Sequence, residues 1–408
     1  MISGWGPSDR IGLDPVSGGV TMAAGFRAGG IASGVKESGR PDLALVVADV
    51  PSSVAVVTTT NLVKASSCEL SERHAANGAA RAVVINSGNA NVCTPDGEAH
   101  TQRLADGTAS MLGVDATDVL VMSTGVIGVP LPSARIEAAL PDLVADLGDD
   151  QSSADRAALA ITTTDTVSKQ VAYRVTDERG GVCTVGGMAK GVGMIEPAMA
   201  TLLVVLTTDA PIGGLLLNRL LRKAVGATFN RVTVDGDGST SDTVAMLSSG
   251  LAQHPPGLEA VAKAAHAVCA DLAYAVVKDG EGATRVAAIT VRQAATPSDA
   301  EKLARRVATS LLVRAAIHGA DPNWGRVLMA MGTAGVDFDP RRVSVTCAGV
   351  MVCRFGVAAS FDRGQVAAAM NRPEIEIRID IASGDSSATV LTCDLTPEYV
   401  RFNAEYTT

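Results

Sequence analysis

The stretch Gly186-Gly-Met-Ala-Lys-Gly-Val-Gly-Met-Ile-Glu-Pro-Ala-Met-Ala-Thr-Leu-Leu-Val-Val-Leu-Thr-Thr-Asp209 joins a glycine-rich approach to an apolar run that starts at Thr201. The run predicts a buried strand. Glycines let the backbone turn sharply and approach other groups closely, so a reactive peptide bond could be held here. The segment Gly191–Pro197 fits a structural turn or a weak phosphate loop equally well, since it lacks the full GxxxxGK[ST] and GxGxxG patterns.

Outward from this stretch, β-branched runs alternate with Ala- and Leu-rich helical segments, which indicates a mixed α/β fold. The segment Ile375–Ile381 alternates strictly and predicts a half-exposed strand. Ser298 and Glu301 form a capping box that predicts a helix through about Leu312. Pro141–Ser153, rich in Asp, is the expected linker. Further strands are expected at 82–85, 119–122, 286–291 and 343–346, and further helices at 215–227 and within 254–277.

Composition excludes several classes of protein. The chain has 408 residues, of which 47% are hydrophobic and 19% charged, as in ordinary globular proteins. A net charge of −9 and 3% aromatic residues disfavour nucleic-acid binding. Seven cysteines without CxxC spacing fit reduced thiols, and the five scattered histidines make no zinc motif, so no metal site is expected.

The N-terminal sequence carries no basic region followed by an apolar core, so no signal peptide is expected. The most apolar stretch, Met199–Leu217, is interrupted by Asp209 and Pro211 and should not span a membrane. The sequence therefore predicts a soluble, cytoplasmic protein.

Thr201 is the residue with the most reactive potential in this stretch. A threonine that becomes the first residue of a chain can use its own α-amine, with a pKa of ~7.7–8.0, as the base that activates its hydroxyl. This requires a cut between Ala200 and Thr201, in which Oγ attacks the preceding carbonyl and water hydrolyses the ester. From these residues alone, Thr201 is more often an ordinary residue at the start of a buried strand than a nucleophile.

A series of motifs runs in one order from about residue 20 to the C-terminus. Together these motifs resemble the signatures of the ornithine acetyltransferases, also called glutamate N-acetyltransferases, and an ordered series is far more specific than one motif. They are Gly25-Phe-Arg-Ala-Gly-Gly-Ile-Ala-Ser-Gly-Val-Lys36 with Asp42-Leu-Ala-Leu45, Asn86-Ser-Gly-Asn-Ala-Asn91 with Cys93-Thr94, Ser123-Thr-Gly-Val-Ile-Gly128, Thr163-Thr-Asp165, Ala189–Leu203, Asp279-Gly-Glu-Gly-Ala-Thr284, Asp321-Pro-Asn-Trp-Gly-Arg326 and Phe402-Asn-Ala-Glu-Tyr-Thr-Thr408.

The resemblance implies a specific chemistry. Thr201 would be the nucleophile of both self-cleavage and acyl transfer, and Thr124 with Gly125 would form the oxyanion hole. Without the resemblance, Ser123–Gly125 is typical of a turn at a strand end. Implied substrate contacts are Thr164, Lys190, Thr201, Glu281, Asn403 and Thr408.

The charges of two of these residues suit N-acetylornithine. Lys190 could bind the substrate carboxylate and Glu281 its side-chain ammonium group, although isolated charged residues are more often solvated on the surface. Asn403 and Thr408 lie in the last six residues, where chains usually fray.

The resemblance also implies a fold and an assembly. The fold would be mixed α/β with facing sheets flanked by helices, cut into chains 1–200 and 201–408 that associate as an α₂β₂ heterotetramer or larger. Acetyl would pass from N²-acetylornithine through Thr201 to glutamate in arginine biosynthesis. No metal or bound cofactor is implied, and acetyl-CoA is a further donor for some members.

Some residues depart from the family pattern. Ser241 stands where Asn is expected, Glu196 where a non-acidic residue is usual, and Arg314–His318 replaces a Lys-Thr-Ala stretch. The loop 235–242 superficially resembles a calcium loop, but its twelfth position is Met246 rather than a bidentate Glu.

Three alternatives stay open at this point. The departures leave room for a paralogue with another acyl donor or acceptor, and water as the acceptor would make the protein an amidase or aminopeptidase. A binding protein on the same scaffold would show no cleavage.

Overall fold

The computed structural model describes Trp5 and residues 10–196 and 202–405. These residues form two compact units. The larger unit comprises 10–196, 202–230 and 237–276, and the smaller one comprises chiefly 231–236 and 277–405. The larger unit includes residues on both sides of position 201, so the two expected chains, 1–200 and 201–408, do not correspond to the two units.

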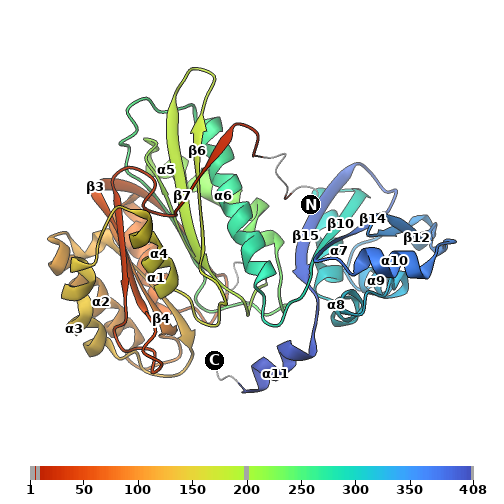
Figure 1. The fold of residues 1–408 in the computed structure, drawn as a ribbon, viewed down its shortest axis with the longest axis horizontal. Helices are drawn as coiled ribbons and strands as arrows, with labels where there is room; N and C mark the ends of the chain where they lie inside the picture. Colours follow the sequence, from red (N-terminus) through yellow and green to blue (C-terminus); the bar gives the residue numbers. More distant parts are fainter. Residues whose placement is uncertain (1–4, 6–9, 197–201, 406–408) are drawn as a thin grey trace. The chain divides into compact units, whose positions relative to one another are not determined.

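The larger unit is built on one sheet (Figure 1). The strands pair in the order β1-β6-β7-β8-β9-β3-β4-β5, with β2 beside β3, and only β8–β9 and β4–β5 are parallel. Strands β7 and β8 are antiparallel neighbours, with Lys190 opposite Leu203. The bounds are β1 Leu13–Val16, β2 Phe26–Ile31, β3 Leu43–Thr58, β4 Ala79–Asn89, β5 Val119–Val126, β6 Lys169–Thr176, β7 Val182–Lys190, β8 Leu203–Thr208 and β9 Thr243–Ser248.

Helices cover this sheet on both faces because its central strands are apolar on both sides. Leu43 and Leu45 of β3 pack in one core with α1, α2 and α3, which gather at the left of Figure 1. Ala44 and Val46 pack on the other side in a core that includes α4. The helices of this unit are α1 Ser66–His74, α2 Gly97–Leu112, α3 Ser133–Ala145, α4 Gln151–Ala160, α5 Gly214–Ala227 and α6 Leu258–Lys278.

The glycines of β7 have a packing role. A Cβ at Gly186 would lie 2.1 Å from the carbonyl oxygen of Gly19, and one at Gly187 would lie 3.0 Å from Val268 of α6. Only hydrogen fits at these positions, so the pair lets neighbouring backbone and a helix lie close to the strand that carries Lys190.

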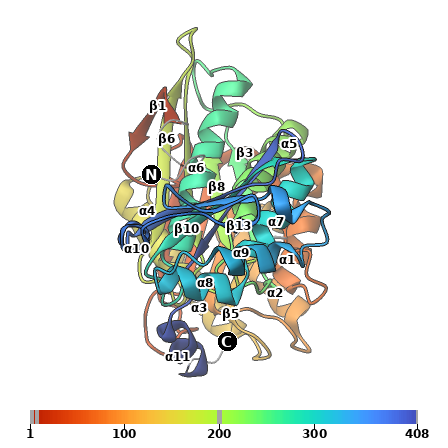
Figure 2. The same cartoon turned by 90° about the vertical axis from the view of Figure 1, so that its right-hand side faces the viewer.

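The smaller unit has a sheet in the order β13-β12-β11-β14-β10-β15. Figure 2 shows α7, α8 and α9 along this sheet, and one core joins all three to the strands. The bounds are β10 Val286–Ala294, β11 Ser344–Cys347, β12 Val350–Arg354, β13 Val357–Ala358, β14 Glu374–Asp380, β15 Ser386–Cys393, α7 Pro297–Ala308, α8 Leu311–His318, α9 Trp324–Met331, α10 Arg363–Met370 and α11 Pro397–Glu405.

The mixed α/β prediction is confirmed, with each sheet flanked by helices. Strand β14 alternates between buried and half-buried residues, as its sequence predicts. The linker prediction is wrong, because Pro141 lies inside α3, Gln151 begins α4, and both helices belong to the larger unit.

The capping prediction is also wrong in position. Thr296, not Ser298, caps α7 by accepting a hydrogen bond from the amide of Asp299. The helix begins at Pro297, earlier in the chain than predicted, because the fixed φ of proline suits the first helical turn. The helix ends at Ala308, and Ser310 caps a separate helix, α8.

Helix α6 is the one helix in the described part of the chain that is long and apolar enough to cross a membrane. In the most apolar 18-residue stretch of α6, 61% is buried inside the protein. A helix in the core of a protein meets the same criteria of length and apolar composition.

Candidate functional site

Thr124 and Gly125 lie near the end of β5, where the ladder with β4 becomes irregular. Gly125 has a φ of +132°, and a Cβ there would lie 2.3 Å from the carbonyl carbon of Gly88. No other residue fits this conformation and this close approach. The Thr124 side chain is buried. Glycine at 125 is therefore required to bring two backbone segments together beside a buried hydroxyl.

Lys190, at the end of β7, donates a hydrogen bond from its ammonium group to Thr124 Oγ1 at 3.3 Å. Its side chain is only 2% exposed, so the alternative that Lys190 is a solvated surface charge is wrong. The structure thus brings two of the sequence-predicted site residues, Thr124 and Lys190, into direct contact inside the larger unit.

Asp165 organises the backbone around Lys190. Its carboxylate accepts hydrogen bonds from the amide of Gly191 at 2.9 Å, from the amide of Thr163 at 3.0 Å and from the Lys169 ammonium group at 2.7 Å. Burial opposes its ionisation, but the charges of Lys190 and Lys169 and these bonds lower the pKa of Asp165 to about 2. Thr164, predicted to bind substrate, sits half-buried in the loop that Asp165 holds.

Lys36 is a half-buried cation near this cluster. Its ammonium group donates to the carbonyl oxygens of Pro41 and Thr162, each at 2.7 Å. Burial, together with the charges of Arg40 and Lys190, lowers the pKa of Lys36 to about 8, against the opposing charges of Asp42 and Asp165.

Sequence reasoning assigned no role to Lys36, Asp165 or Asp242. The first two stand inside motifs of the family pattern, and Asp242 ends a loop considered only for calcium. The sequence did offer one signal for these residues, which is a charged residue inside an apolar or glycine-rich motif. A charged side chain in such a place is a candidate for burial, and charged side chains are buried only when they are paired. Burial itself, which decides their importance, depends on tertiary packing.

Glu281 and Asn403 belong to the smaller unit and contact each other. The Asn403 side-chain amide donates to Glu281 Oε2 at 2.9 Å. Residues up to Glu405 are helical in α11, so Asn403 is held in a regular element rather than in a frayed tail.

Residues 314–318, which depart from the family pattern, support the loop 279–284 that carries Glu281. Buried Arg314 donates to the carbonyl oxygen of Cys393 at 2.9 Å, and His318 Nδ1 lies 2.9 Å from Asp394 Oδ2. Asp394 in turn accepts from the amide and the hydroxyl of Thr284. These substitutions therefore act on the structure of this loop.

Three predicted site residues lie outside the described part of the chain. They are Ala200 and Thr201 of the expected cut and Thr408 of the substrate site. The residues that flank the cut are described: β7 ends at Lys190, and Leu202 precedes β8.

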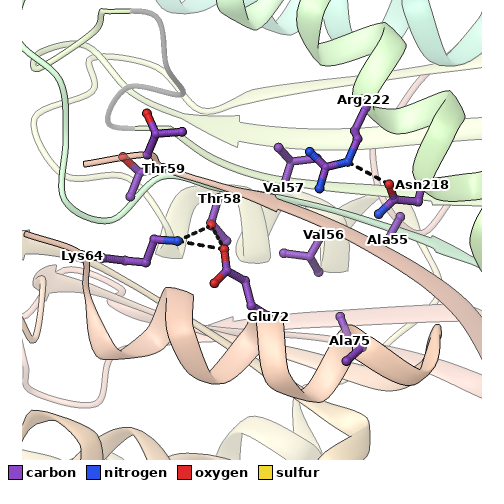
Figure 3. Close-up of a pocket in the computed structure, with 12 residues that line it drawn as sticks. Ala55, Val56, Val57, Thr58, Thr59, Lys64, Glu72, Ala75, Asn218 and Arg222 are labelled. Carbon is purple, nitrogen blue, oxygen red and sulfur yellow. Dashed lines mark hydrogen bonds and ion pairs between the residues drawn. The ribbon is translucent and has the colours of Figure 1, made fainter. Parts of the chain in front are cut away.

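A pocket of about 500 Å³ opens in the larger unit between β3, α1 and α5 (Figure 3). Lys64 donates to Glu72 Oε1 at 2.8 Å and to Thr58 Oγ1 at 3.1 Å, and Arg222 donates to Asn218 at 2.8 Å. The pocket contains none of the described site residues predicted from the sequence. Lys64 pairs with Glu72 and Arg222 bonds the Asn218 side chain, and we assign the pocket no function.

The Thr124 cluster suits an anionic intermediate. Thr124 presents a hydroxyl and Lys190 a cation in a buried setting, where such groups interact more strongly with developing charge than they do in water. Over the described ranges 10–196 and 202–405, no group of three or more His, Cys, Asp or Glu side chains could hold a metal ion.

Comparisons with known proteins agree along nearly the whole length. The model of the ArgJ family matches residues 27–408. An arginine biosynthesis bifunctional protein ArgJ of Streptomyces coelicolor is 46% identical over 390 residues, covering 95% of this chain and 99% of that protein. A protein of the same name from Mycobacterium tuberculosis is 44% identical over 395 residues, covering 95% and 96%.

A solved chain of ornithine acetyltransferase complexed with ornithine, from Mycobacterium tuberculosis, is also similar. It is 41% identical and covers 45% of this chain and 98% of its own length, with a TM-score of 0.42.

Proposed function

The chain belongs to the ArgJ family, and on this premise we propose that it is an acyltransferase of arginine biosynthesis. It moves acetyl from N²-acetylornithine to glutamate through an acetyl ester on Thr201. The nucleophile is freed when the chain cuts itself between Ala200 and Thr201. Its relatives are named bifunctional, and one similar solved chain is an ornithine acetyltransferase with ornithine bound.

The observation that carries the mechanism is the hydrogen bond between Lys190 and Thr124. Lys190 and Leu203 lie opposite each other on β7 and β8, so the loop that contains the scissile bond begins and ends beside this contact. A nucleophile freed in that loop needs an oxyanion-stabilising group nearby, and Thr124 is a buried hydroxyl next to the constrained backbone of Gly125.

Each predicted residue then has a role. Thr201 attacks the acetyl carbonyl, with its α-amine as base, and Thr124 and Gly125 stabilise the tetrahedral oxyanion. Lys190 and Thr164 bind the carboxylate end of N-acetylornithine, and Glu281, Asn403 and Thr408 bind the end that carries the side-chain ammonium group. Glutamate replaces ornithine and takes the acetyl group, which gives ping-pong kinetics.

The assembly and the co-substrate are also part of the proposal. Chains 1–200 and 201–408 associate as an α₂β₂ heterotetramer or larger, in the cytoplasm and without a bound cofactor. Acetyl-CoA is a second acetyl donor, since the word bifunctional in the names of the relatives fits two donor reactions.

Intact mass spectrometry tests the proposal. Protein of 41.5 kDa should appear as two fragments separated between Ala200 and Thr201. N-acetylornithine should add one acetyl group to the fragment that begins at Thr201, and glutamate should remove it as N-acetylglutamate. Omitting glutamate separates transferase from hydrolase, because a hydrolase would lose the acetyl group to water at the same rate.

Matched variants complete the experiment. Thr201→Ser keeps a hydroxyl and should still be cut, whereas Thr201→Ala should stay one chain and transfer nothing. An uncut wild-type chain that is fully active would overturn the proposal.

A further inference from the structure

Lys36 joins three segments of the larger unit, which are its own loop, the end of β4 and the loop that follows α4. Its backbone amide donates to Asp42 Oδ2 at 2.8 Å, and its ammonium group donates to the carbonyl oxygens of Pro41 and Thr162, each at 2.7 Å. Asp42 is fully buried and also accepts from the amide of Ser33 at 2.6 Å. The loop around Lys36 is therefore fixed on Asp42, and the lysine side chain reaches from it to Thr162.

The stem of Lys36 packs on the backbone of Gly88 at the end of β4. A Cβ at Gly88 would lie 2.9 Å from Lys36 Cγ, so the lysine occupies the space that a side chain at position 88 would need. Gly88 in turn lies against Gly125, where a Cβ would lie 2.3 Å from the Gly88 carbonyl carbon. Lys36, Gly88 and Gly125 are therefore packed in series, and the lysine stem supports the backbone proposed to stabilise the oxyanion.

The position of Gly125 depends on this packing. The ladder between β4 and β5 shifts register at Gly88 and Asn89, and Gly88 and Gly125 have φ values of +99° and +132°. Ladder hydrogen bonds alone do not fix such an irregular pair, so packing on Gly88 contributes to where Gly125 lies. A donor that stabilises an oxyanion must be held within about 0.5 Å of its productive position. Support for Gly88 therefore bears on the proposed catalytic step.

The ammonium group of Lys36 acts on the other half of the proposed site. Thr162 begins the loop that ends at Asp165, and Thr164, which is proposed to bind substrate, is half-buried within it. Lys36 holds the carbonyl oxygen of Thr162, and Asp165 accepts from the amide of Thr163 at 3.0 Å. The backbone before Thr164 is therefore held by two charged side chains, one from outside the loop and one from its end.

We propose that Lys36 is a positioning residue that couples the two halves of the site, its stem placing the Gly88–Gly125 backbone and its ammonium group placing the loop of Thr164. The proposal rests on the function proposed above, in which Gly125 stabilises the oxyanion and Thr164 binds substrate. Lys36 needs no contact with the reacting atoms, because both effects pass through backbone that it touches. The two effects are separable, since different atoms of the side chain produce them.

Two substitutions separate the stem from the ammonium group. Lys36→Met keeps Cγ against Gly88 but removes the donor to Thr162. The KM for N-acetylornithine should then rise about 2- to 10-fold, as for the loss of one hydrogen bond, while kcat stays within about 2-fold. Lys36→Ala also removes Cγ, so kcat should in addition fall about 10- to 100-fold, as expected when a catalytic group is displaced.

The rates must be free of any effect of unfolded protein. They are therefore expressed per Thr201 that N-acetylornithine can acetylate, counted by intact mass spectrometry. Lys64→Met is the matched control, because Lys64 is also half-buried and also donates to two oxygens, Glu72 Oε1 and Thr58 Oγ1. It lines the pocket of Figure 3, away from the predicted site residues, and both constants should stay at their wild-type values.

The split between KM and kcat decides the proposal. Wild-type constants in both Lys36 variants overturn it, and so does a fall in kcat that is equal in Lys36→Met and Lys36→Ala. If Lys36→Ala does not fold, Lys36→Met still decides, because an unchanged KM in that variant overturns the proposal. A wild-type chain that forms no acetyl ester on Thr201 refutes the proposed function itself. A wild-type chain that forms the ester, with both Lys36 variants kinetically unchanged, refutes only the role of Lys36.

Discussion

Lys190 on β7 and Thr124 on β5 share a hydrogen bond of 3.3 Å although four strands separate β7 from β5 in the sheet order. In a flat sheet with strands about 4.8 Å apart, β7 and β5 would lie roughly 24 Å from each other. The sheet must therefore curl. One core contains Ile85 of β4 and Met188 of β7 together, so apolar side chains from both halves of the sheet belong to the same core. Twist and core packing thus create the contact on which the proposed site depends.

Replacing Lys190 tests whether its charge recognises the substrate carboxylate. Lys190→Met should raise the KM for N-acetylornithine about 10- to 100-fold, since a hydrogen bond to a charged group contributes about 1.5–3 kcal/mol. Steady-state kinetics measure this change. Lys64→Met is the control, because that lysine pairs with Glu72 in the pocket of Figure 3, and its KM should not change. An unchanged KM in Lys190→Met would remove the carboxylate assignment.

Gly125 should tolerate no side chain. Gly125→Ala places a Cβ against the Gly88 backbone at a positive φ, so the two strands must separate, and acyl transfer should fall by at least 100-fold. Gly128→Ala is the matched control, since its φ is +80° but nothing lies within 4 Å of the added carbon. The control should lower stability by about 1–2 kcal/mol, the cost of a Cβ at positive φ, with transfer intact. Equal losses of transfer in both variants would refute the steric explanation.

The buried pair of Asp165 and Lys169 should respond to loss of one partner. Asp165→Asn removes the negative charge 2.7 Å from the buried Lys169 ammonium group, so the free energy of unfolding should fall by about 3–5 kcal/mol. Urea unfolding measures it. The double variant Asp165→Asn with Lys169→Met should recover much of the loss. If the double variant is no more stable than Asp165→Asn, the buried Lys169 charge is not the cause.

The same pair predicts a direction for acid unfolding. The folded-state pKa of Asp165 is lowered from 3.8 to about 2. Its contribution to stability is therefore present above pH ~4 and is lost as the pH falls from about 4 to 2. Asp165→Asn should lack this part of the pH dependence.

Cleavage should not separate the two chains. Lys190 and Leu203 flank the expected cut on paired strands, and β8 is bonded on its other side to β9. Fragments 1–200 and 201–408 should therefore elute together from a gel-filtration column under native conditions and separate only in denaturant. Separation of the fragments in native buffer would contradict the pairing of β7 with β8.

Sequence patterns alone gave the fold class, the positions of several strands and the ordered motifs that carry the family resemblance. Local patterns suffice for these, because alternation in β14 and apolar runs in β4 and β5 depend only on neighbouring residues. Sequence patterns misplaced the start of α7, and they predicted a linker at Pro141–Ser153, which covers the end of α3 and the start of α4. Competition between nearby capping residues and the packing of helices decides these boundaries.

Which charged residues are buried, and which of them contact one another, depends on the tertiary fold. Lys36, Asp165 and Asp242 look in the sequence like many other charged residues of the chain. Asp165 and Asp242 are buried and Lys36 is half-buried. Desolvation and neighbouring charges alter the pKa of each of these groups, and both depend on strands distant in sequence. The contact of Lys190 with Thr124 likewise exists because the sheet curls around a common core.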